Sequence, residues 1–240
     1  MFEPSNGNCH FAFMNVGLSH SRWEWERLLD RPGWRADTEE HILAKLDRFI
    51  RHSSIDRITK EVKAPAPERL TFLNLDCIFH GDAYLPYLGP FKKLEVLRLC
   101  QSGVTDAGLQ SLPDLPELRE IYLNATSVTD AGAAALARFP KLEILFATKT
   151  GITDEGIKAL APTLPSLRKL VLIATAVTDA SVDALSNMMM LEELDLCQTA
   201  VSAEGLERLR QALPKCKILP LGRPAPCANT EPDANDDDDI

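Results

Sequence analysis

The chain has 240 residues, of which 45% are hydrophobic and 25% charged, and a formal net charge of -9. It is long enough to bury a sizeable core, and no apolar stretch is long enough to cross a bilayer, so a membrane partner is not expected. The acidic balance also disfavours nucleic acid. Six cysteines are scattered without a disulfide framework or metal-ligand spacing, which favours free thiols and a cytoplasmic location.

Residues 1–69 contain no repeated motif. Asp37 to Glu40 has capping-box spacing. The apolar residues after it recur at helical intervals: Ile42, Leu43, Leu46, Phe49 and Ile50. An amphipathic helix is therefore predicted. The segment is expected to be a helical cap on the region that follows, because open ends of a repeat array must be covered. A separate recruitment segment is the alternative.

Residues 70–221 repeat one leucine pattern, LxxLxL. It begins at Leu70, Leu94, Leu118, Leu142, Leu167 and Leu191, and a last copy is Cys216, Leu219 and Leu221. Intervals of 24 or 25 residues with this pattern predict leucine-rich repeats, each with one short strand and one helical segment. The expected fold is α/β, a right-handed solenoid of about six repeats plus a terminal strand. A parallel sheet forms one face and short helices the other.

The repeat register places each element. Strands are predicted near residues 72, 96, 120, 144, 169 and 193, and helices beginning near 82, 106, 130, 154, 179 and 203. Strand alternation directs Leu97 and Leu99 inward, and Val96, Arg98 and Cys100 outward. A hydroxyl column follows the strands, at Ser102, Thr126, Thr150, Thr175 and Thr199. Buried hydroxyls need partners, so these are expected to bond backbone groups of the neighbouring repeat.

A motif of the Val-Thr-Asp-Ala-Gly-Leu type then begins each helix. Thr105 suits the N-cap, and Asp106 suits the positive end of its own helix. A column of small residues, Gly108, Gly132, Gly156, Ser181 and Gly205, indicates close approach of successive helices. The two 25-residue intervals are expected to place their extra residue between Leu160 and Leu164 and between Leu209 and Leu213.

These motifs resemble the leucine-rich repeat proteins with the consensus LxxLxLxxTxVTDAGLxxLxxLPxL, which are abundant in planctomycete-type bacteria. The pattern is also related to the cysteine-containing repeats of eukaryotic F-box proteins. The resemblance covers Leu70 to Leu221 and implies the fold, but no particular partner, because such repeats serve many functions. The first repeat departs from the pattern at His80, Gly81 and Tyr84, as terminal repeats commonly do.

Residues 222–240 are expected to be a disordered acidic tail. From residue 223 onward one arginine stands against six carboxylates, a net charge of -5. Such a composition cannot support a core. A solubilising end is the simplest interpretation. A docking segment for a basic partner, or a cation site, is the alternative.

No catalytic, metal or cofactor motif is recognisable. The five histidines lack HExxH or paired ligand spacing, and no phosphate-binding loop or GxSxG elbow occurs. The repeat aligns four aspartates in a carboxylate row: Asp106, Asp130, Asp154 and Asp179. Their position at the start of each helix explains them without a catalytic role. A Cys–His pair assembled by the fold, through Cys100 or Cys197, stays open. The expectation is a protein that is not an enzyme and carries neither metal nor cofactor.

The outward strand positions supply the candidate site. Five of them, Tyr122, Ile144, Phe146, Val171 and Ile173, should form one apolar patch with Arg98, Glu120, Lys169, Glu193 and Asp195 around it. Patches rimmed by charge often mark interaction sites. We therefore predict a protein-interaction scaffold whose partner-binding residues are Tyr122, Phe146, Ile144, Val171, Ile173, Arg98 and Asp195. The alternative for the patch is that the N-terminal segment or a second copy covers it.

A second functional reading is the substrate-recognition subunit of a ubiquitin ligase. Residues 22–62 would then supply the helices that bind the ligase adaptor, although the Leu-Pro helix opening typical of an F-box is missing there. The sequence does not identify the partner of either kind of protein.

Overall fold

The computed structural model describes residues 69–78 and 80–219. They belong to one compact unit. The predicted cap over residues 1–69 lies almost wholly outside the described residues, as do the predicted helices of residues 22–62 and the acidic tail over 222–240. These three assignments stay predictions.

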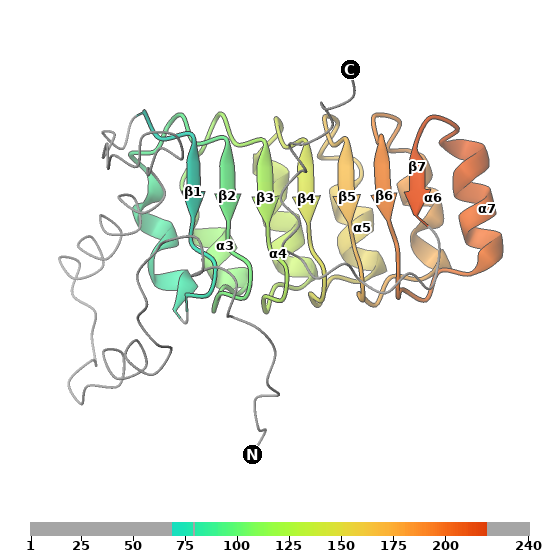
Figure 1. Ribbon diagram of the computed structural model, residues 1–240, viewed down its shortest axis with the longest axis horizontal. Helices are drawn as coiled ribbons and strands as arrows, with labels where there is room; N and C mark the ends of the chain where they lie inside the picture. Colours follow the sequence, from blue (N-terminus) through green and yellow to red (C-terminus); the bar gives the residue numbers. More distant parts are fainter. Residues whose placement is uncertain (1–68, 79, 220–240) are drawn as a thin grey trace, which may run out of the picture. The chain divides into compact units, whose positions relative to one another are not determined.

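The described residues form one sheet of seven parallel strands in chain order (Figure 1). The strands are β1 (Phe72–Asn74), β2 (Val96–Arg98), β3 (Glu120–Tyr122), β4 (Ile144–Phe146), β5 (Lys169–Val171), β6 (Glu193–Asp195) and β7 (Lys217–Leu219). Every neighbouring pair is parallel and in register. The predicted leucine-rich repeat architecture and strand order are confirmed.

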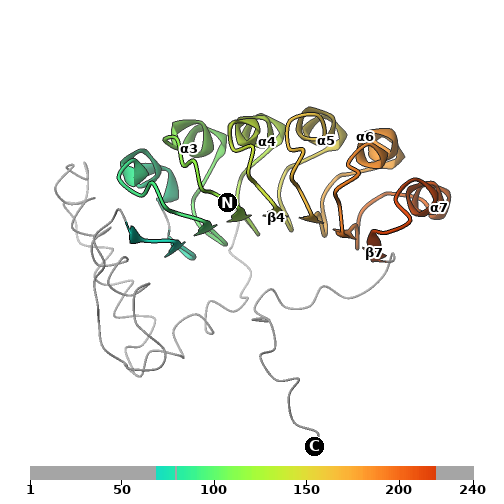
Figure 2. The ribbon, with the colours of Figure 1, turned by 90° about the horizontal axis from the view of Figure 1, so that it is seen from above.

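Short helices lie on the other side of the sheet. They are η2 (Gly81–Ala83), η3 (Leu85–Leu88), α3 (Asp106–Ser111), α4 (Asp130–Ala135), η4 (Leu136–Arg138), α5 (Asp154–Leu160), η5 (Asp179–Ser181), α6 (Val182–Ser186) and α7 (Ala203–Ala212). Figure 2 shows the strands along the inner side of a curved row and the helices along its outer side. The core lies between these layers, where Leu97, Leu99 and Ile121 are fully buried. The predicted inward alternation is therefore correct.

The last repeat differs from its prediction by one residue. In the β6–β7 register Leu194 pairs with Ile218, an interval of 24 residues, so Ile218 enters the core and Leu219 faces outward. The extra residue predicted between Leu209 and Leu213 is present at the end of α7, since Cys216 N bonds Leu213 O as Leu191 N bonds Met188 O. The interval returns to 24 residues only in β7, after Cys216. The other 25-residue interval is confirmed, since Ile144 pairs with Lys169.

The hydroxyl column bonds its own repeat, so the predicted bonds to the neighbouring repeat are wrong. Each hydroxyl donates to a carbonyl three residues earlier in its own repeat, as Thr126 does to Leu123 at 2.7 Å and Thr150 to Ala147 at 2.8 Å. The residue before each hydroxyl has positive φ, 54° at Ala125 for example. This left-handed residue turns the chain so that the hydroxyl faces its own strand. The bond to the neighbouring repeat is made by the backbone instead, from Ala125 N to Thr148 O at 2.8 Å.

The aspartates at the helix starts serve the following repeat. Asp106 accepts hydrogen bonds from the N–H and hydroxyl of Thr129, at 2.7 and 2.6 Å, and from the N–H of Gly132 at 2.9 Å. Asp82, Asp130 and Asp154 bind the next repeat's threonine in the same two ways. Thr105 has the extended backbone of an N-cap, but its side chain makes no cap bond. The prediction that each aspartate supports its own helix therefore misses its main contacts. We call this series the aspartate ladder.

The small column is explained by the same aspartates. A Cβ placed on Gly132 would overlap Asp106 Oδ1, and it would lie 2.8 Å from Val128 Cγ1. A Cβ at Gly156 or Gly205 would likewise meet Asp130 or Asp179. Glycine is favoured at these positions because a carboxylate of the preceding repeat occupies the space that a Cβ would take. Asp106, Asp130 and Asp179 are the first residues of α3, α4 and η5, so the predicted close approach of successive helices is confirmed.

Candidate partner-binding face

The outward side chains of β1 to β7 form what we call the sheet face. Tyr122 and Phe146 lie opposite each other in the β3–β4 register. Their rings are stacked, with centroids 4.7 Å apart and planes inclined by 10°. Parallel strands are spaced by about 4.8 Å, so the sheet itself holds the two rings at stacking distance.

A cation lies on each side of this ring pair. Arg98 Cζ is 5.1 Å from the Tyr122 centroid, and Lys169 Nζ is 5.2 Å from the Phe146 centroid. Arg98, Tyr122, Phe146 and Lys169 therefore form a continuous series across β2 to β5, which we call the aromatic row. With their faces occupied, the two rings offer mainly their edges to a partner, and ring edges carry the positive end of the aromatic quadrupole.

Acidic side chains hold the row in place. Arg98 Nη2 lies 2.9 Å from Asp76 Oδ2, and Lys169 Nζ lies 2.9 Å from Glu193 Oε2. The Tyr122 hydroxyl donates to Glu120 Oε2 at 2.9 Å. Burial, and then this hydrogen bond, raises the pKa of Tyr122. The phenol therefore stays a neutral donor at physiological pH.

The structure divides the predicted patch into two parts. Tyr122, Ile144 and Phe146 are half-buried, as is Arg98. Val171 and Ile173 are buried instead, with 4% and 5% exposure, and Phe146 packs against the group that they form. The predicted apolar patch is therefore continuous from Phe146 to these two residues, but its exposure is uneven. Asp195, expected on the rim, is only 6% exposed. Whether the predicted residues bind a partner is a separate question that stays a prediction.

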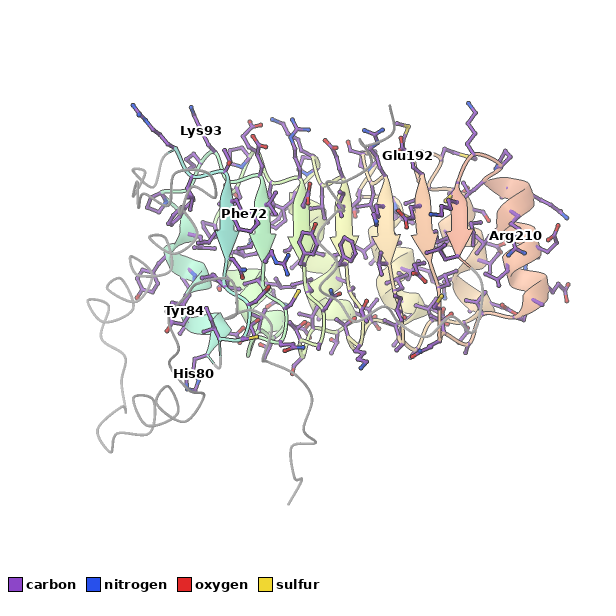
Figure 3. The ribbon with its side chains drawn as sticks, in the orientation of Figure 1. Phe72, His80, Tyr84, Lys93, Glu192 and Arg210 are labelled. Atoms are coloured by element: carbon purple, nitrogen blue, oxygen red, sulfur yellow. The ribbon has the colours of Figure 1, made fainter. Side chains whose placement is uncertain are left out.

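Val171, Ile173 and Cys197 form a buried group that we call the β5–β6 cluster. Phe146, Ala174 and Leu219 pack against it. The sequence did not predict Leu219 on this face, because Leu219 fits the LxxLxL pattern of the core leucines. At the other end, Phe72 on β1 is exposed at 38% (Figure 3).

Cys100, one of the two thiols considered for catalysis, lies where the thiolate is disfavoured. The pKa of the Cys100 thiol is raised to about 12, first by burial and then by the charge of Asp76, so little thiolate exists at neutral pH. The described ranges contain no group of three or more His, Cys, Asp or Glu side chains suited to a metal ion. The carboxylate row considered in the sequence is the aspartate ladder, whose oxygens bind backbone and hydroxyl groups.

A groove between the ends of α5 and α6 is a second feature that the sequence did not reveal. Its volume is about 510 Å³, and its lining includes Pro162, Leu164, Pro165, Met188 and Met190. Met189 and Met190 are exposed at 72% and 58%. Three consecutive methionines were the available sequence signal, since methionine suits adaptable binding surfaces.

Neither the family models nor the curated proteins that were searched match this chain. Among solved structures, it is similar to a leucine-rich repeat protein of Leptospira interrogans, at 22% identity and a TM-score of 0.38. The alignment covers 54% of this chain and 38% of that one, so this chain spans well under half of that protein's length. The fold of this chain follows from its own repeats and register. It is a leucine-rich repeat solenoid. No helix in its described part is long and apolar enough to span a membrane.

Proposed function

We propose that this protein is a non-enzymatic scaffold that binds another protein through its sheet face, in a reducing cytoplasm and without nucleic acid or membrane as partner. The observation that carries the proposal is the aromatic row. Two stacked rings are held on adjacent central strands, half-buried and flanked by ion-paired cations. Tyrosine and arginine are common binding hot spots.

Preorganisation supports this assignment. The two rings are fixed by stacking and by the strands, so little side-chain entropy is lost when a partner arrives. Ring edges favour acceptor oxygens and apolar groups. The partner is therefore expected to present carbonyl or carboxylate oxygens, together with aliphatic side chains, to Tyr122 and Phe146. Ile144 and Arg98 extend this contact. Val171, Ile173 and Asp195 are buried and are therefore expected to contribute less to the contact.

The ubiquitin-ligase alternative depends on residues 22–62, which lie outside the described residues. No observation on the repeats favours it over a general scaffold.

Affinity capture with matched baits tests the proposal. Wild type, Tyr122→Ala, Phe146→Ala and the groove variant Met189→Ala are used under the same conditions, and captured proteins are quantified by mass spectrometry. A partner bound by the sheet face is lost from both aromatic variants and kept by Met189→Ala. Loss from Met189→Ala alone would place the binding site in the α5–α6 groove and refute the proposal.

A further inference from the structure

The α5–α6 groove contains backbone acceptors as well as apolar side chains. Its lining includes Lys158 and Ala161 at the end of α5, together with Pro162 and Pro165. A helical carbonyl is normally bonded by the N–H four residues later. For Lys158 and Ala161 those positions are the two prolines, which have no N–H. Both carbonyls therefore lack the donor that a continued helix would provide.

The joint between α3 and α4 shows how the same kind of helix end is satisfied elsewhere in this chain. Arg138 donates from Nη1 to Gln110 O at 3.3 Å and from Nη2 to Leu109 O at 3.1 Å. Its Nη2 also donates to Leu112 O. One guanidinium of the following repeat thus binds three carbonyls at the end of α3.

The joint between α5 and α6 has no such arginine. Arg138 follows the first residue of α4, Asp130, by eight residues, and Asn187 follows the first residue of η5, Asp179, by the same interval. Asn187 therefore takes the place of Arg138 in its repeat. Its side chain is shorter and donates to Asp183 O of its own repeat, at 2.9 Å.

The groove lies at the position that a guanidinium occupies in the α3–α4 joint. Lys158 is the counterpart of Gln110, since each comes four residues after the aspartate that begins its helix. Asn187 and Lys158 both line the groove. The neighbouring helices α5 and α6 (Figure 2) thus leave open, at about 510 Å³, a space that Arg138 fills between α3 and α4.

The charge of this space favours a cation. The last carbonyls of a helix carry its negative end. Lys158 is the one basic side chain among the described residues that line the groove, and its Nζ pairs with Glu155 Oε1 at 2.7 Å. The apolar part of the lining suits an aliphatic stem, because methionines such as Met190 adapt to the shape of a ligand.

We propose that the α5–α6 groove binds an arginine side chain of a partner protein. The guanidinium donates to the carbonyl oxygens of Lys158 and Ala161, and the methylene stem packs against Met190 and Pro162. Arginine fits several carbonyls at once, because its five N–H donors are fixed in one plane. This site goes beyond the sheet face of the proposed function and uses none of the aromatic row, so either can fail without the other.

Methionine-methyl NMR on the full chain detects occupancy of the groove directly, since Met188, Met189 and Met190 line it. Their signals are assigned with Met189→Leu and Met190→Leu. The probe is the capped peptide acetyl-Leu-Arg-Leu-amide, and the matched control peptide carries citrulline, which keeps the shape of arginine without its charge. The arginine peptide should shift these signals and bind about ten-fold more tightly than the citrulline peptide, because its hydrogen bonds are charge-assisted. Equal affinities, or no shift up to the solubility limit of the peptide, would overturn the inference.

A variant that supplies the arginine from within the chain gives a second measurement. Asn187→Arg should fill the groove as Arg138 fills the α3–α4 joint, and so weaken binding of the arginine peptide by about ten-fold or more. Asn187→Gln, which adds length without charge, is the matched control and should keep binding. Unchanged affinity of a folded Asn187→Arg protein contradicts the inference. If this variant does not fold, the comparison of the two peptides on wild type decides.

Tyr122→Ala separates this site from the sheet face. It should bind the arginine peptide as wild type does, because Tyr122 lies on β3 and is not part of the groove lining. Loss of peptide binding in a folded Tyr122→Ala protein would move the arginine site to the aromatic row and overturn the inference.

Discussion

Asp106 binds Thr129 of the following repeat through both the backbone N–H and the hydroxyl, at 2.7 and 2.6 Å. The same carboxylate also accepts the N–H of Gly132, in the first turn of α4. One repeat therefore completes the helix start of the next, and the joint between repeats is polar as well as apolar.

Removal of this carboxylate should weaken the joint. Asp106→Ala is expected to lower the free energy of unfolding by about 1–2 kcal/mol, a value reduced by the partial exposure of the bonds. Asp106→Asn should cost less, because its amide oxygen still accepts and its amide nitrogen can donate to the Thr129 hydroxyl. Urea denaturation measures both. Asp114→Ala, at an exposed position outside any helix or strand, is the control and should change stability by less than about 0.5 kcal/mol.

A side chain at Gly132 should be costly for the same reason. Gly132→Leu is expected to lose roughly 1–3 kcal/mol of stability by overpacking, despite its better helix propensity. Gly89→Ala is the matched control, since its new Cβ would lie 3.9 Å from the nearest neighbour, Pro113 Cβ. Chemical denaturation should give a clearly lower midpoint for Gly132→Leu than for Gly89→Ala. Equal midpoints would show that the carboxylate moves aside at little cost.

Binding should depend on the aromatic row. Tyr122→Ala is expected to weaken affinity for the captured partner by about 2 kcal/mol or more, since a buried aromatic anchor is lost. Tyr122→Phe keeps the stack and removes only the bond to Glu120, so most of the affinity should remain. Titration calorimetry measures both, alongside thermal melts. Normal binding by Tyr122→Ala in a folded protein rules out the aromatic row as the site.

Acid stability should reflect Asp179. Hydrogen bonds from Ser202, first from its side chain and then from its backbone N–H, lower the pKa of Asp179. A lowered folded-state pKa stabilises the protein above the unfolded-state pKa near 4, and this contribution is lost as the pH falls through the folded-state value. Stability of Asp179→Asn should therefore fall less between pH 5 and pH 3, roughly the titration range of such a carboxyl. Parallel curves of unfolding free energy against pH for wild type and Asp179→Asn would contradict this.

The sequence predicted elements better than contacts. The repeat interval identified which positions are equivalent, and strands and helix starts followed from Leu97, Asp106 and their counterparts. The interval did not show which repeat a side chain bonds. The sequence pattern is the same whether the Thr126 hydroxyl bonds its own repeat or the neighbouring one. Partners were decided by the left-handed backbone at Ala125.

The candidate site was predicted only in part for a related reason. Ile218 and Leu219 are both apolar, and a shift of one residue exchanges the core and outer faces of a strand. Likewise, the direction of Val171 follows from alternation, but its burial depends on how the side chains of neighbouring strands pack around it, which no strand pattern contains.

The two ends of the aspartate ladder determine how this array can lengthen. The first repeat has Asp82 but carries Gly81 where later repeats carry threonine, and the last has Ser202 but carries Ala203 where others carry aspartate. The first repeat thus has only the carboxylate acceptor of the joint, and the last repeat has only the donor. Each of these groups faces the neighbouring repeat. An interior repeat keeps both halves, so a duplicated copy of residues 130–153 would bring a matching acceptor and donor to its two new junctions. Growth by internal duplication is therefore chemically self-consistent, whereas addition beyond either end would create a joint with one half missing.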